Sequence, residues 1–128
     1  MSLEIDKLLI ERLFEQAKES PRLRMNYDLR TSLADTSQRM LNALLPGTEV
    51  PIHRHESTSE TVVCICGRLE EMIYEEKEDG SFQEISRHLL CPTEGMYGMQ
   101  IPAGAWHTIR VLEPSVIFEA KDGAFVPR

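Results

Sequence analysis

The sequence predicts an all-β domain, a small antiparallel barrel preceded by one amphipathic helix. Short extended runs separated by turn residues fill the chain from residue 22 onward, which is typical of a β-sandwich or barrel. Before residue 21 the apolar residues instead follow a helical spacing. With 128 residues, the chain is long enough for one hydrophobic core and too short for two. We therefore expect one domain over 1–128, with the helix in 1–20 and the barrel in 22–125.

The helix is predicted over Leu3 to Ala17, where Ile5, Leu9 and Leu13 continue one apolar side. Ser2 is the expected N-cap, because its hydroxyl can accept a hydrogen bond from a free backbone N–H of the first turn. Pro21 ends the helix, since the residue before a proline is pushed out of helical geometry.

The strands of the barrel are expected between successive turn signals. The Asp79-Gly80 pair is the clearest hairpin turn, and Gly67 is expected to end one strand and begin another. Cys64 and Cys66 share the parity of Glu60, so all three are expected to face the barrel interior. The candidate strands are 23–29, 38–45, 48–54, 61–66, 68–76, 82–90, 97–102, 106–112 and 115–120.

Net charge, apolar segments and cysteine content limit the partners and the cellular compartment that we expect for this protein. The formal net charge of −7 argues against nucleic acid as a partner, because phosphate backbones are bound by clustered Lys and Arg. No apolar segment reaches the length of a membrane span, and the N-terminus lacks the features of a signal peptide. The three cysteines do not form a disulfide framework and are expected to be reduced, so we expect a cytoplasmic protein.

Three of the four histidines occupy positions that suit a metal site. His53 and His55 are two residues apart, so in an extended segment both imidazoles point to the same side. Glu60 follows a polar turn, and His107 follows the rigid turn 102–105. Three imidazoles and one carboxylate suit a divalent transition metal, and Fe, Mn, Ni, Co and Zn are all compatible. Such a set leaves coordination positions open, as catalytic sites do.

These residues stand in a recognisable pattern. The stretch 47–67 (GTEVPIHRHESTSETVVCICG) resembles the first motif of the cupin superfamily, and 95–107 (GMYGMQIPAGAWH) resembles the second. The second motif is one residue longer than usual between its glycine and proline, and Val111 stands where many members carry Asn. The resemblance implies a double-stranded β-helix, a small jelly-roll barrel, with His53, His55, Glu60 and His107 as metal ligands.

A narrower resemblance covers most of the chain. The N-terminal helix, the segment 22–30 (RLRMNYDLR) and the segment 117–125 (IFEAKDGAF) are similar to the WbuC-type cupins, which are associated with lipopolysaccharide O-antigen gene clusters. This resemblance implies lipopolysaccharide biosynthesis and a sugar-like ligand, and the lack of a membrane-spanning segment argues against a membrane partner. Because small barrels commonly cover their edge strands by dimerisation, a homodimer is expected.

Two classes of function follow from these observations. The first is an enzyme acting on a saccharide or sugar-nucleotide, either a metal-dependent isomerase or epimerase or an Fe(II)-dependent oxygenase. The second is a non-catalytic protein that binds a sugar or another small molecule through its metal. An isomerase needs a separate acid or base, and the sequence shows no clear one outside the ligand set. Candidate substrate-binding residues at the barrel mouth are Arg24, Asn26, Tyr97, Glu119 and Lys121.

Overall fold

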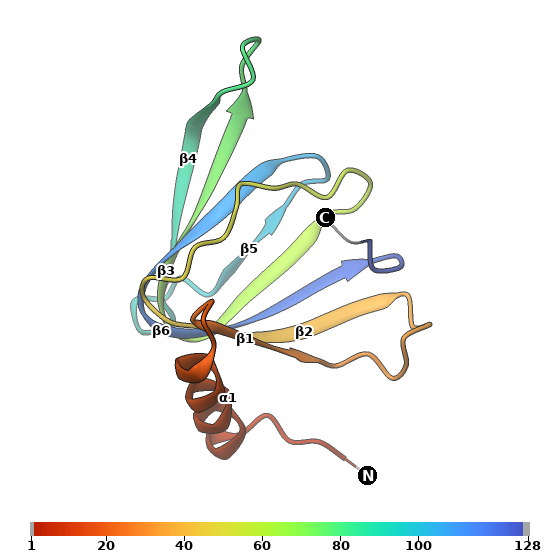
Figure 1. The fold of residues 1–128 in the computed structure, drawn as a ribbon, viewed down its shortest axis with the longest axis vertical. Coiled ribbons are helices and arrows are strands. Elements are labelled where there is room, and N and C mark those ends of the chain that lie inside the picture. The colour runs from red at the N-terminus through yellow and green to blue at the C-terminus, as the bar shows by residue number, and fades with distance from the viewer. Residues whose placement is uncertain (1, 127–128) are drawn as a thin grey trace.

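The computed structural model describes residues 2–126, in which one helix precedes an antiparallel β-sheet that curls into a barrel (Figure 1). The expected fold class is confirmed. None of the helices in these residues is long and apolar enough to cross a bilayer. The elements are α1 (Lys7–Glu19), β1 (Arg24–Asp28), β2 (Ser37–Leu44), β3 (Glu60–Glu76), β4 (Phe82–Leu90), the 3₁₀ turn η1 (Pro92–Glu94), β5 (Gly98–Ile101) and β6 (Trp106–Asp122).

The helix begins later than the sequence predicts. Its N-cap is Asp6, whose side chain accepts a hydrogen bond of 2.9 Å from the backbone N–H of Leu9. The prediction of Ser2 as N-cap was therefore wrong. Ile5 is 47% exposed, so no packing would stabilise a turn that included it. Leu9 and Leu13 are buried, as the helical spacing indicated.

Two long strands organise the sheet. β3 pairs with β6 along most of its length, whereas four separate strands were expected there. The N-terminal half of β3 also pairs with β5, and its C-terminal half pairs with β4. The C-terminal half of β6 pairs with β2, which pairs with β1. The sheet therefore divides into two halves that diverge from a shared bend, and α1 packs beneath β1 and β2 (Figure 1).

The bend lies at Gly67, where the ladder between β3 and β6 changes register. Ser115 closes this irregular region because its buried hydroxyl accepts a hydrogen bond of 2.9 Å from the N–H of Arg68 and donates one of 2.7 Å to the carbonyl of Glu113. The strands thus continue through both positions where the sequence predicted breaks. Side-chain bonds replace the ladder bonds that the bulge and Pro114 remove.

The segment 48–54 is not a strand, in contrast to the prediction. Pro51 has no N–H to donate to a ladder, and only His53 forms a β-bridge, with His107. The hydroxyl of Thr108 donates to the carbonyl of Val50 and holds the segment against the start of β6. This irregular segment carries His53, and His55 follows directly after it, also outside any strand.

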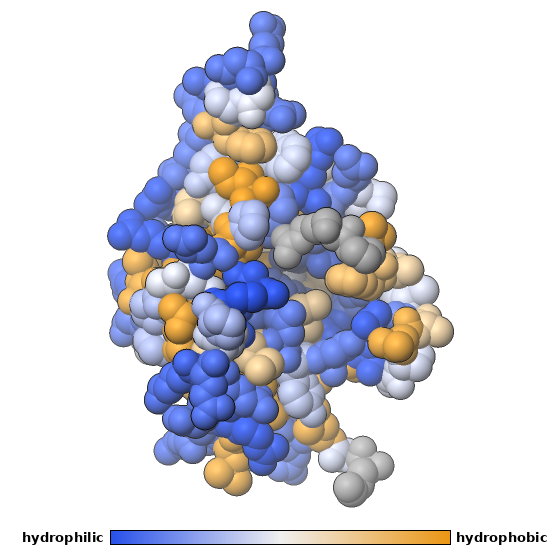
Figure 2. Space-filling model, in the orientation of Figure 1, coloured by the Kyte–Doolittle hydropathy of each residue, from blue (hydrophilic) through white to orange (hydrophobic). Residues whose placement is uncertain are grey.

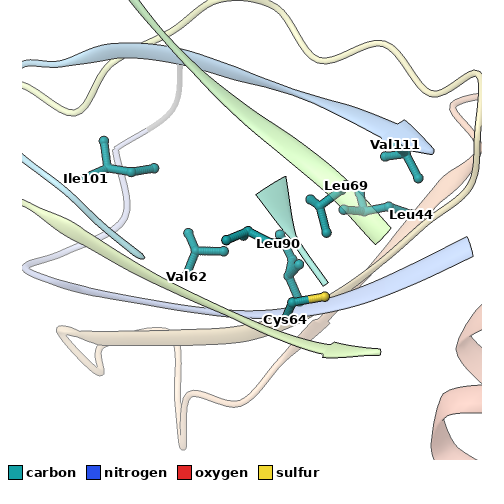
Figure 3. Close-up of a cluster of buried hydrophobic side chains, with 8 residues drawn as sticks. Leu44, Val62, Cys64, Leu69, Leu90, Ile101 and Val111 are labelled. Atoms are coloured by element: carbon teal, nitrogen blue, oxygen red, sulfur yellow. The ribbon is translucent and has the colours of Figure 1, made fainter. Parts of the chain in front are cut away.

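The core has two parts. One fills the space between the halves of the sheet and includes Val62 and Cys64 (Figure 3). The other lies between the sheet and α1, and the half-buried Cys66 packs there. The prediction that Cys66 faces the barrel interior was therefore wrong, because a register shift between the two cysteines reverses the alternation of side chains.

The turn at Asp79-Gly80 joins β3 to β4 in a hairpin, as predicted. The backbone N–H of Lys77 donates 2.8 Å to the carbonyl of Ser81, and Asp79 accepts a hydrogen bond of 2.9 Å from the N–H of Ser81. Residues 75–80 are all exposed, and Figure 2 shows this tip as hydrophilic. The acidic run there is a solvated turn.

Replacing Gly67 with Ala should be far more destabilising than replacing Gly80 with Ala. Both glycines have positive φ angles, of 101° and 84°, which cost an alanine about 1–2 kcal/mol. A Cβ on Gly67 would also lie 2.4 Å from the carbonyl oxygen of Pro114, whereas one on Gly80 would meet nothing within 4 Å. We expect a loss of more than about 3 kcal/mol for Gly67→Ala in urea denaturation. Equal losses in the two variants would contradict this account of the bend.

Candidate metal centre

Three imidazoles converge at one end of the barrel. The ring centroids of His53 and His107 lie 4.3 Å apart, and that of His55 lies 5.3 Å from His53 and 5.7 Å from His107. One ring nitrogen from each residue can be chosen so that all three lie within 4.8 Å of one another. The sequence predicted this grouping, although the pair His53 and His55 comes from an irregular segment and not from a strand.

Backbone hydrogen bonds hold the two contributing segments together. The N–H of His53 donates 3.0 Å to the carbonyl of His107, and the N–H of His107 donates 2.8 Å to the carbonyl of His53. The N–H of Gly104 donates 2.8 Å to the carbonyl of His55. The turn before β6 is therefore fixed against the segment that carries the first two histidines.

The Nδ1 atoms of two histidines are occupied by backbone carbonyls. His53 Nδ1 lies 2.8 Å from the carbonyl oxygen of Pro51, and His107 Nδ1 lies 2.9 Å from that of Ala105. Because a carbonyl only accepts, each Nδ1 carries the hydrogen and each Nε2 presents a lone pair. Metal-binding histidines are commonly oriented in this way.

His107 is 2% exposed, and its Nε2 is buried without a hydrogen-bond partner. Burial lowers the pKa of His107, which favours the neutral imidazole that a metal requires. Buried polar atoms are rarely left unpaired in folded proteins. An acceptor nitrogen of this kind, next to two further imidazoles, fits a divalent transition metal.

Glu60 lies beside the histidines at the start of β3. Its Oε2 is 3.0 Å from His55 Nε2 and 3.6 Å from Lys121 Nζ. Burial opposes ionisation of Glu60, but the hydrogen bond to His55 and the charge of Lys121 outweigh it, so the pKa lies below its ordinary value. The group of ring nitrogens within 4.8 Å of one another contains the three histidines and not Glu60, whose carboxylate contacts that group through His55.

The five residues expected to bind substrate are in different surroundings. Lys121 is at the site, with Nζ 3.5 Å from His55 Nε2. Glu119, two residues earlier on β6, lies opposite Val62 of the interior core and is half-buried. Both therefore face the barrel interior.

The other three candidates are less directly connected to the histidines. Arg24 donates a 2.7 Å hydrogen bond to the carbonyl of Glu49 and so ties β1 to the following loop. Asn26 is exposed on the edge strand β1. Tyr97 is 61% exposed and lines an open cleft of about 620 Å³ between β4 and the segment before β5.

The structure also shows a buried acid that the sequence analysis overlooked. Glu71 lies between Leu69 and Ile73 on the interior face of β3, is 1% exposed, and its Oε2 has no hydrogen-bond partner. Burial first, and then the negative charges of Glu60 and Glu119, raise the pKa of Glu71 well above its ordinary value. Strand parity could have revealed it, because a Glu at an apolar position marks a candidate functional group.

A family model described as a domain of unknown function (DUF6016) matches residues 5–87, which is more than half of the chain. The chain belongs to this family. No curated protein matches its sequence. The description of this family names no activity.

Solved structures share the fold of this DUF6016 chain. CapF from Staphylococcus aureus, a capsular polysaccharide assembling protein, matches with a TM-score of 0.65 and 19% identity over 84% of this chain and 30% of CapF. BH2720 from Bacillus halodurans matches with a TM-score of 0.63 and 17% identity over 99% of this chain and 86% of its own. KdgF from Halomonas sp. matches with a TM-score of 0.59 and 15% identity over 83% of this chain and 83% of its own.

These are cupin-fold proteins, so the cupin jelly-roll fold of this chain is confirmed. The chain spans less than a third of the length of CapF. At such low identity the likeness shows the fold alone. The resemblance to the WbuC-type cupins stays a prediction.

The free energy of unfolding of the Glu71→Gln variant should increase relative to that of the natural protein as the pH rises. A free Glu ionises near pH 4.5 in the unfolded chain, whereas Glu71 keeps its proton to higher pH when folded. Above about pH 4.5 the folded state thus binds more protons, and its stability falls as pH rises through the folded pKa. The glutamine cannot ionise, so we expect its relative stability to rise by about 1–3 kcal/mol between pH 5 and pH 8.

This comparison is made by urea denaturation in the presence of a chelator, so that metal does not contribute. Glu70→Gln is the matched control, because Glu70 is the next residue along the strand and its own carboxylate is paired with Arg87. If the free energies of unfolding of Glu71→Gln and of the natural protein changed with pH by the same amount, a raised pKa at Glu71 would be contradicted.

Proposed function

We propose that His53, His55 and His107 bind one divalent transition metal and that Glu60 is its fourth ligand. The observation that carries this proposal is the convergence of three imidazoles in which the buried Nε2 of His107 has no partner. The orienting hydrogen bonds at Nδ1 of His53 and His107 support it.

The donor set suits Fe, Mn, Ni, Co or Zn, because imidazole nitrogens are borderline ligands. When bound, such a metal would supply a Lewis acid able to polarise a carbonyl or hydroxyl oxygen. Lys121 is placed to keep the Glu60 carboxylate ionised and oriented. Metal binding at His55 Nε2 would require this nitrogen to give up its 3.0 Å contact with Glu60 Oε2.

For the substrate we propose a saccharide or sugar-nucleotide of surface-polysaccharide metabolism, such as lipopolysaccharide biosynthesis. Lys121 supports an acidic ligand, because an ammonium can pair with a carboxylate or phosphate. The fold likeness to CapF, described as assembling capsular polysaccharide, points in the same direction. Isomerisation or epimerisation is the reaction class that the polarised oxygen would serve.

We also propose that residues 1–128 act as one domain, in the cytoplasm and as a homodimer. Cys64, Cys66 and Cys91 are free thiols, which suits a reducing compartment. β1 and β4 end the order of paired strands in the part of the chain that the structure describes, and an unpaired edge favours association with a second copy.

Replacing His107 with Ala should remove the metal and leave the fold intact. We expect about one metal ion per chain in the natural protein, purified without chelators or a histidine tag, and at least about tenfold less in the variant. His88→Ala is the matched control, since His88 is exposed and its Nε2 contacts Ser86. Elemental analysis measures the content, and unchanged stoichiometry in His107→Ala would remove His107 from the ligand set.

The sugar proposal is tested by thermal unfolding of the metal-loaded protein with UDP-sugars and with free uronic acids. A ligand at a hundred times its Kd stabilises the folded state by about 2.7 kcal/mol, enough to raise the Tm by several degrees. Lys121→Met should abolish the rise, and His88→Ala should preserve it. The absence of any rise across both ligand classes would contradict a saccharide substrate.

A further inference from the structure

Glu71 and His107 lie on neighbouring positions of one ladder. Ile73 of β3 is directly opposite His107 of β6, and Glu71 is directly opposite Ile109. Directly opposed residues point to the same face of a sheet, and such diagonal neighbours are about 7–8 Å apart. The Glu71 carboxyl therefore faces the interior on the same side as the His107 ring.

The two residues also share an unusual state. Glu71 Oε2 and His107 Nε2 are both buried side-chain atoms with no hydrogen-bond partner in the described part of the chain. An unpaired buried polar group destabilises the folded state, and an apolar side chain at residue 71 would avoid that cost. Polar groups kept at such a cost are concentrated at functional sites.

The charges around Glu71 favour a neutral carboxylic acid. Glu60 on β3 and Glu119 on β6 both oppose its ionisation. His88 of β4 is directly opposite Glu71, but it is exposed and its Nε2 lies 3.0 Å from the hydroxyl of Ser86. A neutral carboxyl is a hydrogen-bond donor, which an ionised one is not.

We propose that Glu71 donates a hydrogen bond to an acceptor oxygen of the molecule bound beside the three histidines. This inference rests on the proposed function, because it places that molecule next to the metal. It defines the ligand class as compounds that carry a carbonyl, carboxylate or hydroxyl oxygen near the histidines. It also supplies the proton donor that the ligand set by itself lacks.

The experiment uses the Co(II)-loaded protein, whose visible absorption reports changes in coordination. Acetate is the oxygen-bearing probe, and imidazole, which has no oxygen, is the control probe. Glu71→Met removes the donor and keeps an extended side chain, whereas Glu71→Gln replaces the carboxyl by an amide that can donate. We expect acetate affinity to fall about tenfold in the Met variant, to stay within about threefold in the Gln variant, and imidazole affinity to stay unchanged in both.

A second measurement tests whether the carboxyl is unpaired in the absence of ligand. The Tm of the chelator-treated Glu71→Met variant should be higher than that of the natural protein, because an apolar side chain replaces an unsatisfied carboxyl. A lower Tm would show that Glu71 has a structural partner and would overturn the inference.

The outcomes separate this inference from the metal site itself. Equal acetate affinity in the natural protein and both variants, with Co(II) bound in all three, would overturn the role of Glu71 and leave the metal site standing. Loss of Co(II) from both variants would also overturn it, because Glu71 would then be a ligand of the metal. Failure of the natural protein to bind Co(II) would overturn the proposed metal site.

Discussion

The pairing of β3 with β6 is the constraint on which the rest of the structure depends. One ladder joins Glu60 to Lys121 at one end and Ile73 to His107 at the other, with Glu71 between them. Each half of this ladder then recruits different neighbours, so the sheet bends into a barrel around its interior core. The bend at Gly67 is possible because no side chain occupies the space next to Ser115.

The site combines a rigid frame with an irregular segment. The frame supplies Glu60, His107 and Lys121 from strands, whereas His53 and His55 come from a loop tied to it by paired backbone hydrogen bonds. Loops carry functional groups well when a scaffold fixes them, and here the fixing bonds belong to the histidines themselves. The position of the first two imidazoles is thus coupled directly to that of the third.

Polar groups inside the barrel show a tension between stability and function. Glu60 is buried but compensated by His55 and Lys121, whereas Glu71 and His107 each retain a buried atom without a partner. Burial shifts the pKa of Glu71 upward and that of His107 downward, and both shifts favour neutral groups. Glu71 and His107 therefore face the same interior without adding charge to it.

The sequence by itself determined the fold class, the hairpin turn at Asp79-Gly80 and the histidine grouping, because hydrophobic periodicity, turn residues and ligand spacing are local signals. Only the tertiary structure decided that 48–54 is not a strand, that Cys66 lies outside the barrel interior, and that Lys121 meets Glu60. These features depend on bulges and on pairing between distant segments. Glu71 required both kinds of information, since parity places it inward but only the packed barrel shows that it has no partner for Oε2.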